Sequence, residues 1–364
     1  MVNFSCAKSI EIPSEQIGLN NYNSFDGGNR IFKRSILKKG KYEWEFPIVY
    51  FVDHKFKDHK IDKVLKYIEK STCLAFIKTN CPPKAQLEYK YSTELCCSPI
   101  GRFKSYLTGR SDIYLKESCS KDFGLILHET LHALGLSHEH QRVDRDRYIE
   151  VFEKNFNSFG MKEIGEKDNQ DKFKTFSIRY DYSSIMHYAT TSCSRSFYRT
   201  MQAKNIEPFN KMMGQHYALS FNDIKLLNSY YCHQDCKPER SIKCKNGGYH
   251  SINSTCFRCI CPKNFDGNDC KHVKITHYKF CKKTEQKAQY QVWKHISEEG
   301  FKNCHYLITA EKDYRVHLKI KSVRTQEKLL CAPNLGLEIK YLDDKGVTGL
   351  CLCGIYSGID IISE

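Results

Sequence analysis

The chain has 364 residues, which is long for one domain and predicts two or three. Its formal net charge is +15, because 57 Lys and Arg residues outnumber 42 Asp and Glu residues. Such a balance can favour nucleic acid, anionic surfaces or acidic substrates. No RNP-type aromatic stretch or helix-turn-helix pattern supports nucleic acid, and lysine is spread along the whole chain, as on a solvated surface. No apolar run of about eighteen residues is present. We therefore expect no nucleic-acid partner and no membrane span.

The first expected elements follow from hydrophobic periodicity. Residues 1–34 are polar and are expected to form an irregular leader, whereas residues 46–52 are rich in β-branched and aromatic side chains, typical of a strand. Residues 59–76 carry apolar side chains at helical spacing and predict an amphipathic helix. Further strands are expected at residues 86–91, 111–116, 314–323 and 335–343.

A second and a third helix are predicted from their ends. In residues 123–134 the apolar side chains fall on one face, and Gly135 follows as a helix breaker. Residues 140–183 lack steady periodicity and are expected to form loops and short turns. Residues 220–232 open with Ser220 and, three residues later, Asp223, a pattern that resembles a capping box.

The 19 cysteines indicate the compartment. They cluster from Cys232 onward at short spacings, as in small disulfide-stapled modules of oxidising environments. A cytosolic zinc protein is the alternative, but Cys256–Cys259 lacks the second CxxC pair that a zinc finger needs. Residues 1–20 lack the apolar run of a signal peptide, so either the signal is missing from this version of the sequence or export follows another route. We expect a secreted, extracellular protein; two sequons, at Asn3 and Asn253, are compatible with glycosylation.

Residues 128–140, HETLHALGLSHEH, have the spacing of a metal site. On a helix, His128 and His132 lie one turn apart on one face and can bind one ion. Gly135 can adopt the positive φ that a sharp turn requires. Such a turn allows His138 to come back towards the ion as a third ligand. Zn²⁺ prefers such nitrogen ligands. Glu129 flanks the same face and can reach a water at the metal without binding the metal itself.

Three protein ligands leave a position open, which is typical of catalytic rather than structural zinc. Glu129 is then the expected general base, which takes a proton from water and later gives it to the departing amine. The alternative is a helix with incidental histidines, which HExxH alone would not exclude but Gly135 and His138 make improbable by chance. His140 fits no ligand spacing and is expected to be a solvated or hydrogen-bonding neighbour.

Residues 128–146 and the segment YDYSSIMHY, residues 180–188, resemble the extended zinc signature and the Met-turn of the astacin metallopeptidases. The resemblance implies that Met186 forms a hydrophobic floor beneath the metal. It implies that Tyr188 binds zinc at rest and hydrogen-bonds the oxyanion during turnover. It also implies that Glu139 meets the N-terminus of the mature enzyme.

The resemblance extends along most of the chain, and the combination is most similar to the nematode branch of the family. It implies a pro-segment (1–34), a peptidase domain (35–233), an EGF-like module (234–271) and a CUB-like domain that is incomplete (281–364). The implied disulfides are Cys73–Cys232, Cys97–Cys119, Cys236–Cys256, Cys244–Cys259, Cys261–Cys270, Cys281–Cys304 and Cys331 with Cys351 or Cys353; Cys81–Cys96 is a further suggestion.

The leader departs from the family pattern. Family pro-segments share a Phe-x-Gly-Asp stretch whose Asp blocks the zinc, whereas here Gly28 stands where that Asp is expected, and Asp26 would act only from a shifted register. Counting back from Trp44 by the family spacing places the first mature residue at Ser35, directly after Lys33–Arg34.

The sequence therefore predicts an α+β, astacin-like (metzincin) peptidase domain with a zinc-binding helix and a twisted sheet, followed by an EGF-like module and a partial CUB β-sandwich. The predicted function is that of a secreted endopeptidase with one Zn²⁺ per chain, which hydrolyses extracellular proteins or peptides. The alternative is an extracellular binding protein with little or no peptidase activity, which recognises ligands through its EGF and CUB modules.

Overall fold

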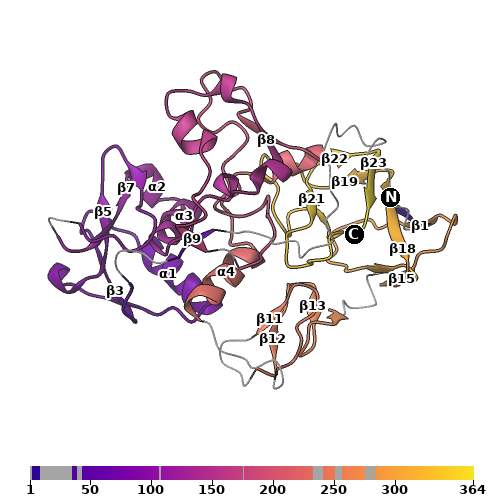
Figure 1. Ribbon diagram of the computed structural model, residues 1–364, viewed down its shortest axis with the longest axis horizontal. Helices are drawn as coiled ribbons and strands as arrows, with labels where there is room; N and C mark the ends of the chain where they lie inside the picture. The colour runs from indigo at the N-terminus through magenta and orange to yellow at the C-terminus, as the bar shows by residue number, and fades with distance from the viewer. Residues whose placement is uncertain are drawn as a thin grey trace.

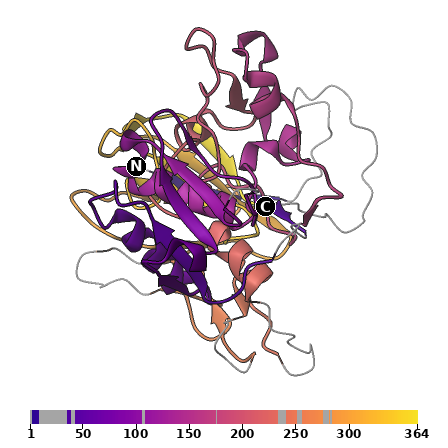
Figure 2. The ribbon, with the colours of Figure 1, turned by 90° about the vertical axis from the view of Figure 1, so that its left-hand side faces the viewer.

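The computed structural model describes residues 2–8, 35–38, 43–105, 108–174, 176–232, 241–250, 256–274, 281 and 284–364. In Figure 1 the chain passes from an indigo lobe, through a central helical region, to a yellow C-terminal lobe. The small strands β11 (Tyr249–His250), β12 (Cys259–Ile260) and β13 (Phe265–Asp266) lie below both lobes. Figure 2 looks along the direction that joins the two lobes, which overlap in this view, with the orange strands at the bottom and magenta segments at the top.

The first lobe contains a five-stranded sheet in the order β4-β3-β5-β7-β6. Its strands pair in parallel except the edge strand β6, which is antiparallel to β7. The strands are β3 (Ile48–Val52), β4 (Phe76–Lys78), β5 (Leu87–Tyr91), β6 (Cys96–Cys97) and β7 (Ser111–Leu115). The strand expectations for residues 46–52, 86–91 and 111–116 are confirmed within one or two residues at each end.

The three predicted helices form, but the first is shorter than expected: it ends at Ser71, and Phe76 begins β4. In α1 (Lys60–Ser71) the apolar stripe is buried: Ile61, Val64, Leu65 and Ile68. Asp122 caps α3 (Phe123–Ala133) by accepting from the backbone N–H groups of Gly124 and Leu125. The capping box predicted at Ser220 and Asp223 is present at the start of α4 (Phe221–Tyr231). A short helix, α2 (Glu117–Ser120), precedes α3.

Short elements occur within residues 140–183, the region expected to form loops and turns, and further short elements lie outside it. They are η2 (Pro82–Lys84), η3 (Glu139–Gln141), η4 (Arg145–Arg147), η5 (Glu153–Asn155), the π-helical η6 (Met161–Gly165), η7 (Glu207–Lys211), and strands β2 (Ile36–Leu37), β8 (Ile149–Val151), β9 (Phe173–Lys174) and β10 (Met201–Ala203). Strand β2 pairs with β9, and β8 pairs with β10. The segment after Arg34 is thereby tied to the middle of the chain.

The C-terminal region is built from short strand pairs, antiparallel except the parallel pair β15 and β17, around one larger sheet. Its further strands are β14 (His272–Val273), β15 (Glu285–Lys287), β16 (Lys294–Ile296), β17 (Leu307–Thr309), β18 (Tyr314–Ile320), β19 (Val323–Arg324), β20 (Leu337–Ile339), β21 (Leu350–Leu352), β22 (Ile355–Tyr356) and β23 (Ile359–Ile362). Strand β18 fulfils the prediction for residues 314–323. Of residues 335–343, only β20 is a strand.

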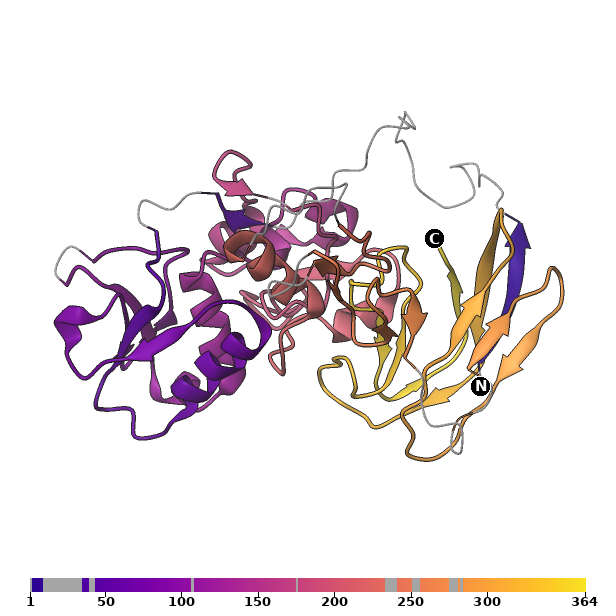
Figure 3. The same ribbon diagram turned by 90° about the horizontal axis from the view of Figure 1, so that it is seen from below.

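A strand from the other end of the chain completes the larger sheet. β1 (Val2–Lys8) lies between β16 and β18 in the order β16-β1-β18-β23, and Figure 3 shows it in indigo among the orange strands. All of its residues are in antiparallel register with β18, from Val2 opposite Ile320 to Lys8 opposite Tyr314. The expectation of an irregular leader is therefore wrong for residues 2–8, because partner strands distant in sequence satisfy their backbone groups.

Five of the implied disulfides are confirmed: Cys73–Cys232, Cys244–Cys259, Cys261–Cys270, Cys281–Cys304 and Cys331–Cys353. The pairing Cys97–Cys119 is wrong, because Cys96 is the partner of Cys119, and this also removes Cys81–Cys96. Adjacent residues of a strand point to opposite faces of the sheet. A shift of one position along β6 therefore decides whether Cys96 or Cys97 faces α2. Cys236, and with it the pairing Cys236–Cys256, lies outside the described residues.

The C-terminal region packs directly against the region after the zinc-binding segment. One apolar cluster includes Phe209 and Met212 on one side and Leu350 and Leu352 on the other. The two regions therefore share a core rather than being joined only by a linker.

Among the described residues, none of the helices has both the length and the apolar character needed to span a membrane.

Candidate metal centre

Helix α3 brings the first two predicted ligands together. His128 and His132 are four residues apart, and their ring centroids lie 4.6 Å from each other. The helix stops at Gly135, which adopts φ +96°, a conformation open to glycine. The chain then returns His138 to the same place, with its ring centroid 4.5 Å from that of His132 and 5.4 Å from that of His128.

These rings present one nitrogen each to a common point. Ligand atoms of His128, His132 and His138 all lie within 4.8 Å of one another. Each Nδ1 has an oxygen partner: the Ile185 carbonyl at 2.9 Å, the Leu136 carbonyl at 2.8 Å and Gln141 Oε1 at 3.1 Å.

These partners fix the tautomer, so that Nδ1 donates and Nε2 keeps its lone pair. The Nε2 atoms of His132 and His138 are 3.0 Å apart. Two lone pairs at that distance repel unless a cation lies between them, so this donor set fits Zn²⁺.

Burial keeps the rings neutral. It lowers the pKa of His128, and it lowers the pKa of His132 and His138 well below the ordinary range, with the neighbouring imidazoles adding to the effect. A neutral imidazole is the form that binds a metal. The burial of the three rings and their geometry therefore both favour neutral imidazoles, the form that binds a metal.

Glu129 follows the first ligand on α3 and is only 8% exposed. Burial raises its pKa from 4.5 to about 7, while a hydrogen bond from the Ser98 backbone acts in the opposite direction. A carboxyl that exchanges a proton near neutral pH is suited to general acid–base work.

Tyr188 and His140 form a cluster of aromatic rings beside the third ligand. The ring centroid of Tyr188 lies 4.3 Å from that of His138 and 4.2 Å from that of His140. The Tyr188 hydroxyl is 3.4 Å from the Glu163 carboxylate. His140 is fully buried and its Nε2 bonds the Glu163 carbonyl at 2.9 Å, so the expected hydrogen-bonding role is confirmed and the solvated alternative is wrong.

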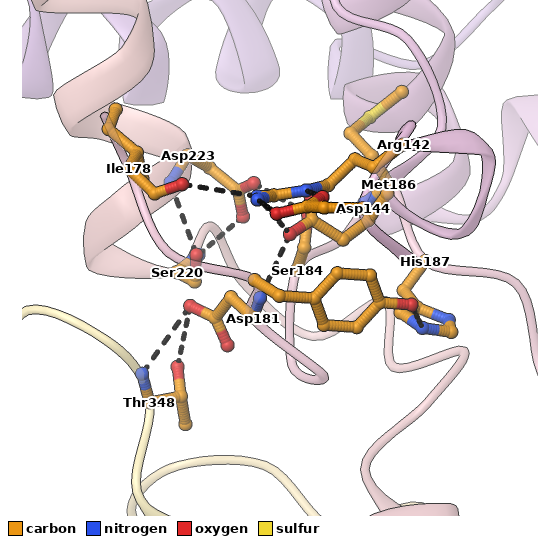
Figure 4. A network of polar contacts seen from close by, with 12 residues as sticks. Arg142, Asp144, Ile178, Asp181, Ser184, Met186, His187, Ser220, Asp223 and Thr348 are labelled. Carbon is orange, nitrogen blue, oxygen red and sulfur yellow. Dashed lines mark hydrogen bonds and ion pairs between the residues drawn. The ribbon is translucent and has the colours of Figure 1, made fainter. Parts of the chain in front are cut away.

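The turn that carries Met186 lies against α4 (Figure 4). Met186 is 1% exposed, as expected of a buried floor. The capping residue Asp223 also accepts hydrogen bonds from Ser184 Oγ at 2.7 Å and from the Ile185 backbone at 3.2 Å. The carboxylate that begins α4 thus also holds this turn. Sequence reasoning identified the cap but missed this second role.

Glu139 lies in a buried polar network that sequence reasoning also missed, and Figure 4 shows its partners Arg142 and Asp181. Its Oε1 accepts from Arg142 at 3.1 Å and from the Asp181 backbone N–H at 2.8 Å. Arg142 is fully buried and also donates to both carboxylate oxygens of Asp144, at 2.8 Å each. The alternating charges of residues 142–146 are the signal that could have indicated such a network.

Ser35 is 4% exposed and lies beside a second buried carboxyl, that of Asp168. One Asp168 oxygen accepts from Ser137 Oγ at 2.7 Å, whereas its Oδ2 is buried without a hydrogen-bond partner. Burial raises the pKa of Asp168 to about 6. The predicted mature N-terminus therefore lies next to an acidic group other than Glu139.

An HExxHxxGxxH helix above a methionine-bearing turn defines the metzincin class of zinc peptidase site. Among known families, the model of the astacin peptidase family matches residues 36–232. The chain therefore belongs to the astacin family.

Several similar relatives are nematode proteins. The chain is 32% identical to the zinc metalloproteinase nas-36 of Brugia malayi over 346 residues, which is 90% of this chain and 56% of that protein. It is also 32% identical to nas-23 of Caenorhabditis elegans, over 79% of this chain and 53% of that protein. The chain thus spans about half the length of the relatives it matches.

One similar solved structure is high choriolytic enzyme 1, a hatching enzyme zinc-protease from the medaka Oryzias latipes. It shares 24% sequence identity with a TM-score of 0.47, and the match covers 54% of this chain and all of that chain.

Proposed function

We propose that the protein is a secreted zinc endopeptidase that hydrolyses peptide bonds of extracellular proteins or peptides. The convergence of the three histidine side chains, with every Nδ1 already bonded to an oxygen, carries the proposal. His128, His132 and His138 would hold the ion. Zinc, when bound, supplies Lewis-acid polarisation of the scissile carbonyl and lowers the pKa of water.

Glu129 is the general base in this proposal. Its carboxyl is buried, and its pKa of about 7 suits a group that takes a proton from the attacking water and then gives it to the leaving amine. Because a buried carboxylate has little competing solvent, the proton is retained between the two transfers. Glu129 is not needed as a ligand, since the three imidazoles already form the donor set.

Tyr188 is the proposed hydrogen-bond donor to the oxyanion. Burial raises the pKa of its hydroxyl, with the Glu163 carboxylate adding to the effect, so the group remains protonated and able to donate. Its ring lies against His138, within reach of a substrate at the metal. Met186 is proposed as the apolar floor that keeps water away from the protein side of the ligands.

The C-terminal region is proposed to comprise an EGF-like module and a partial CUB-like domain. Closely spaced disulfides support this division: Cys244–Cys259 and Cys261–Cys270 in the first, Cys281–Cys304 and Cys331–Cys353 in the second. Such bonds persist in oxidising compartments, which supports secretion. The alternative of a binding protein without peptidase activity is disfavoured because every group needed for catalysis is present at the site.

Activation is proposed to follow cleavage between Arg34 and Ser35. Ser35 is buried, so a new ammonium there would need a carboxylate partner. The resemblance assigns Glu139 to this role, but Glu139 Oε1 already accepts from Arg142 and Asp181. Asp168 has one oxygen without a partner beside Ser35, which makes it the competing acceptor.

Digestion of casein tests the proposed activity. We expect the purified protein, processed before Ser35, to cleave casein, to lose this activity with 1,10-phenanthroline and to regain it when Zn²⁺ is restored. Cleavage that persists in the chelator, or its absence from fully zinc-loaded processed protein, would favour the binding-protein alternative.

A further inference from the structure

The C-terminal region reaches towards the metal centre through one buried side chain. Thr348 precedes β21 and is 6% exposed. Its hydroxyl donates to Asp181 Oδ2 at 3.1 Å, and its backbone N–H approaches the same oxygen at 3.4 Å, as Figure 4 shows. Asp181 is fully buried. A hydrogen bond to a buried carboxylate is charge-assisted and is not weakened by solvent, so this contact holds its geometry.

Asp181 is the first residue of the turn that carries Met186. Its carbonyl accepts from the Ser184 backbone N–H at 3.0 Å, and its Oδ1 accepts from the Ser183 backbone N–H at 3.0 Å. Its own N–H donates to Glu139 Oε1 at 2.8 Å. The position of Asp181 therefore sets where the turn begins.

The other end of the same turn holds a predicted ligand. The Ile185 carbonyl receives the Nδ1 proton of His128 at 2.9 Å, and the Met186 carbonyl receives the Glu139 backbone N–H at 2.9 Å. An acceptor bonded to Nδ1 of a ligating histidine fixes the ring orientation and raises its basicity as a ligand. A small displacement of the turn would therefore rotate His128 relative to the other two rings.

We propose that Thr348 is a positioning residue for the metal centre. It acts from the C-terminal region, through Asp181 and the turn of residues 181–186, on the orientation of His128. The inference rests on the proposed function, because it assigns His128 as a ligand. The C-terminal region then forms part of the support of the catalytic site, in addition to any role in recognition.

The interface between the two regions has other contacts that bypass this turn. Lys211 Nζ pairs with Glu327, and Met212 packs in the shared apolar cluster. Arg179 pairs with Glu364 at 2.5 Å. Loss of the Thr348 hydroxyl should therefore loosen the turn of residues 181–186 but leave the two regions packed together. An effect on the metal centre can then be told apart from an effect on the interface as a whole.

Three variants of the full chain test the proposal. Thr348→Val removes the hydroxyl but keeps the shape, Thr348→Ser restores the donor, and Glu327→Gln weakens the same interface away from the turn. Zinc dissociation constants are measured by competition with a chelator, and kcat and KM on a short peptide.

For Thr348→Val we expect a zinc dissociation constant raised, and a kcat lowered, by about 3- to 10-fold. This is less than the roughly 10- to 100-fold effect of removing a group bonded directly to a ligand. KM should be nearly unchanged, Thr348→Ser should restore wild-type values, and Glu327→Gln should change neither zinc affinity nor kcat.

Wild-type zinc affinity and kcat in Thr348→Val would overturn the proposal, as would equal effects of Thr348→Val and Glu327→Gln. If Thr348→Val does not fold, Asp181→Asn, which keeps the shape of the acceptor and weakens both bonds, is judged by the same criteria. If the wild type hydrolyses no peptide, the proposed function fails, but zinc affinity still decides whether Thr348 positions the site.

Discussion

The peptidase domain and the C-terminal region are stabilised by different means. The peptidase domain has a five-stranded sheet with packed helices and, besides the short-range disulfide Cys96–Cys119, the disulfide Cys73–Cys232, which joins residues 159 apart. In the C-terminal region the disulfides join residues between 9 and 23 positions apart around short strands. A domain with a large core can bury charged groups such as Arg142 and Glu129, whereas a stapled module depends on covalent bonds. Loss of a catalytic group in the first should therefore alter chemistry, whereas loss of a disulfide in the second should alter stability. Thr348, which contacts Asp181 across the interface, is the exception in the second region.

The largest effect is expected at the general base. Glu129→Ala should lower kcat by about 10²- to 10⁴-fold, the range typical of general acid–base catalysis. Zinc should stay bound, because Glu129 is not among the ligand-bearing residues. Metal analysis of the purified variant, beside a peptide cleavage assay, checks both statements.

His132→Ala is the matched control on the same helix, because it should lose zinc and activity together. Near-normal turnover by Glu129→Ala would show that another group takes the proton from water. Loss of zinc from Glu129→Ala would instead move it into the ligand set.

A smaller effect is expected at the oxyanion donor. Tyr188→Phe should lower kcat more than it raises KM, because the lost hydrogen bond forms mainly in the transition state. Removing one such donor typically costs about 2.7–4 kcal/mol. Steady-state kinetics on a peptide substrate measure the two constants separately, and a change confined to KM would contradict the assigned role.

In the proposed EGF-like module, residues 234–271, loss of a disulfide should lower stability but leave catalysis unchanged. Replacing Cys261 and Cys270 by Ser together should destabilise the module by about 2–3 kcal/mol, as expected for a short closed loop, and should leave kcat on a short peptide unchanged. Limited proteolysis and thermal unfolding report the stability. Cys81→Ser is the control, because Cys81 is free and exposed and its loss should change neither quantity. A fall in kcat that accompanies the loss of stability in the double Cys261 and Cys270 variant would contradict the proposed difference between the two regions.

The last effect concerns Asp168 in the uncleaved chain. Because its pKa is raised from 3.8 to about 6, the folded state disfavours the charged form. Well below pH 3.8 the group is protonated in both states and has no effect, and stability is then lost as the pH rises from there through about 6. Asp168→Asn should abolish this loss, roughly 2–3 kcal/mol of unfolding free energy. Urea unfolding of both proteins from pH 4 to pH 7 gives the difference.

The same measurement on chain cut before Ser35 tells which carboxyl receives the new ammonium. If Asp168 does, cleavage should reduce the pH dependence of the wild type and have no such effect in Asp168→Asn. If Glu139 does, Glu139→Gln should remove the stabilisation gained by cleavage, and Asp168→Asn should retain it.

The zinc site could be predicted from the sequence because its signals are local. The ligands, Glu129 and the turn at Gly135 lie within eleven positions, and helical geometry combined with the turn at Gly135 brings them together. The choice between Cys96 and Cys97 could not be predicted in this way, since it depends on which face of β6 meets α2. The contact of Thr348 with Asp181 joins side chains 167 positions apart. A threonine and an aspartate each have many possible hydrogen-bond partners, so the sequence does not predict this pair.

The pairing of β1 with β18 has a consequence for how the chain is made. At roughly 5–20 residues per second, the ribosome releases the partners of Val2 some 15–60 seconds after Val2 itself. Through that interval β1 has unpaired backbone groups on both edges while the peptidase domain, which lies between, can fold. Closure of this sheet joins segments that are far apart in the sequence, and strand pairing of such high contact order is slow. Completion of the sheet therefore has to wait until β18 has been synthesised, and a nascent chain halted before β18 would keep β1 open to other chains.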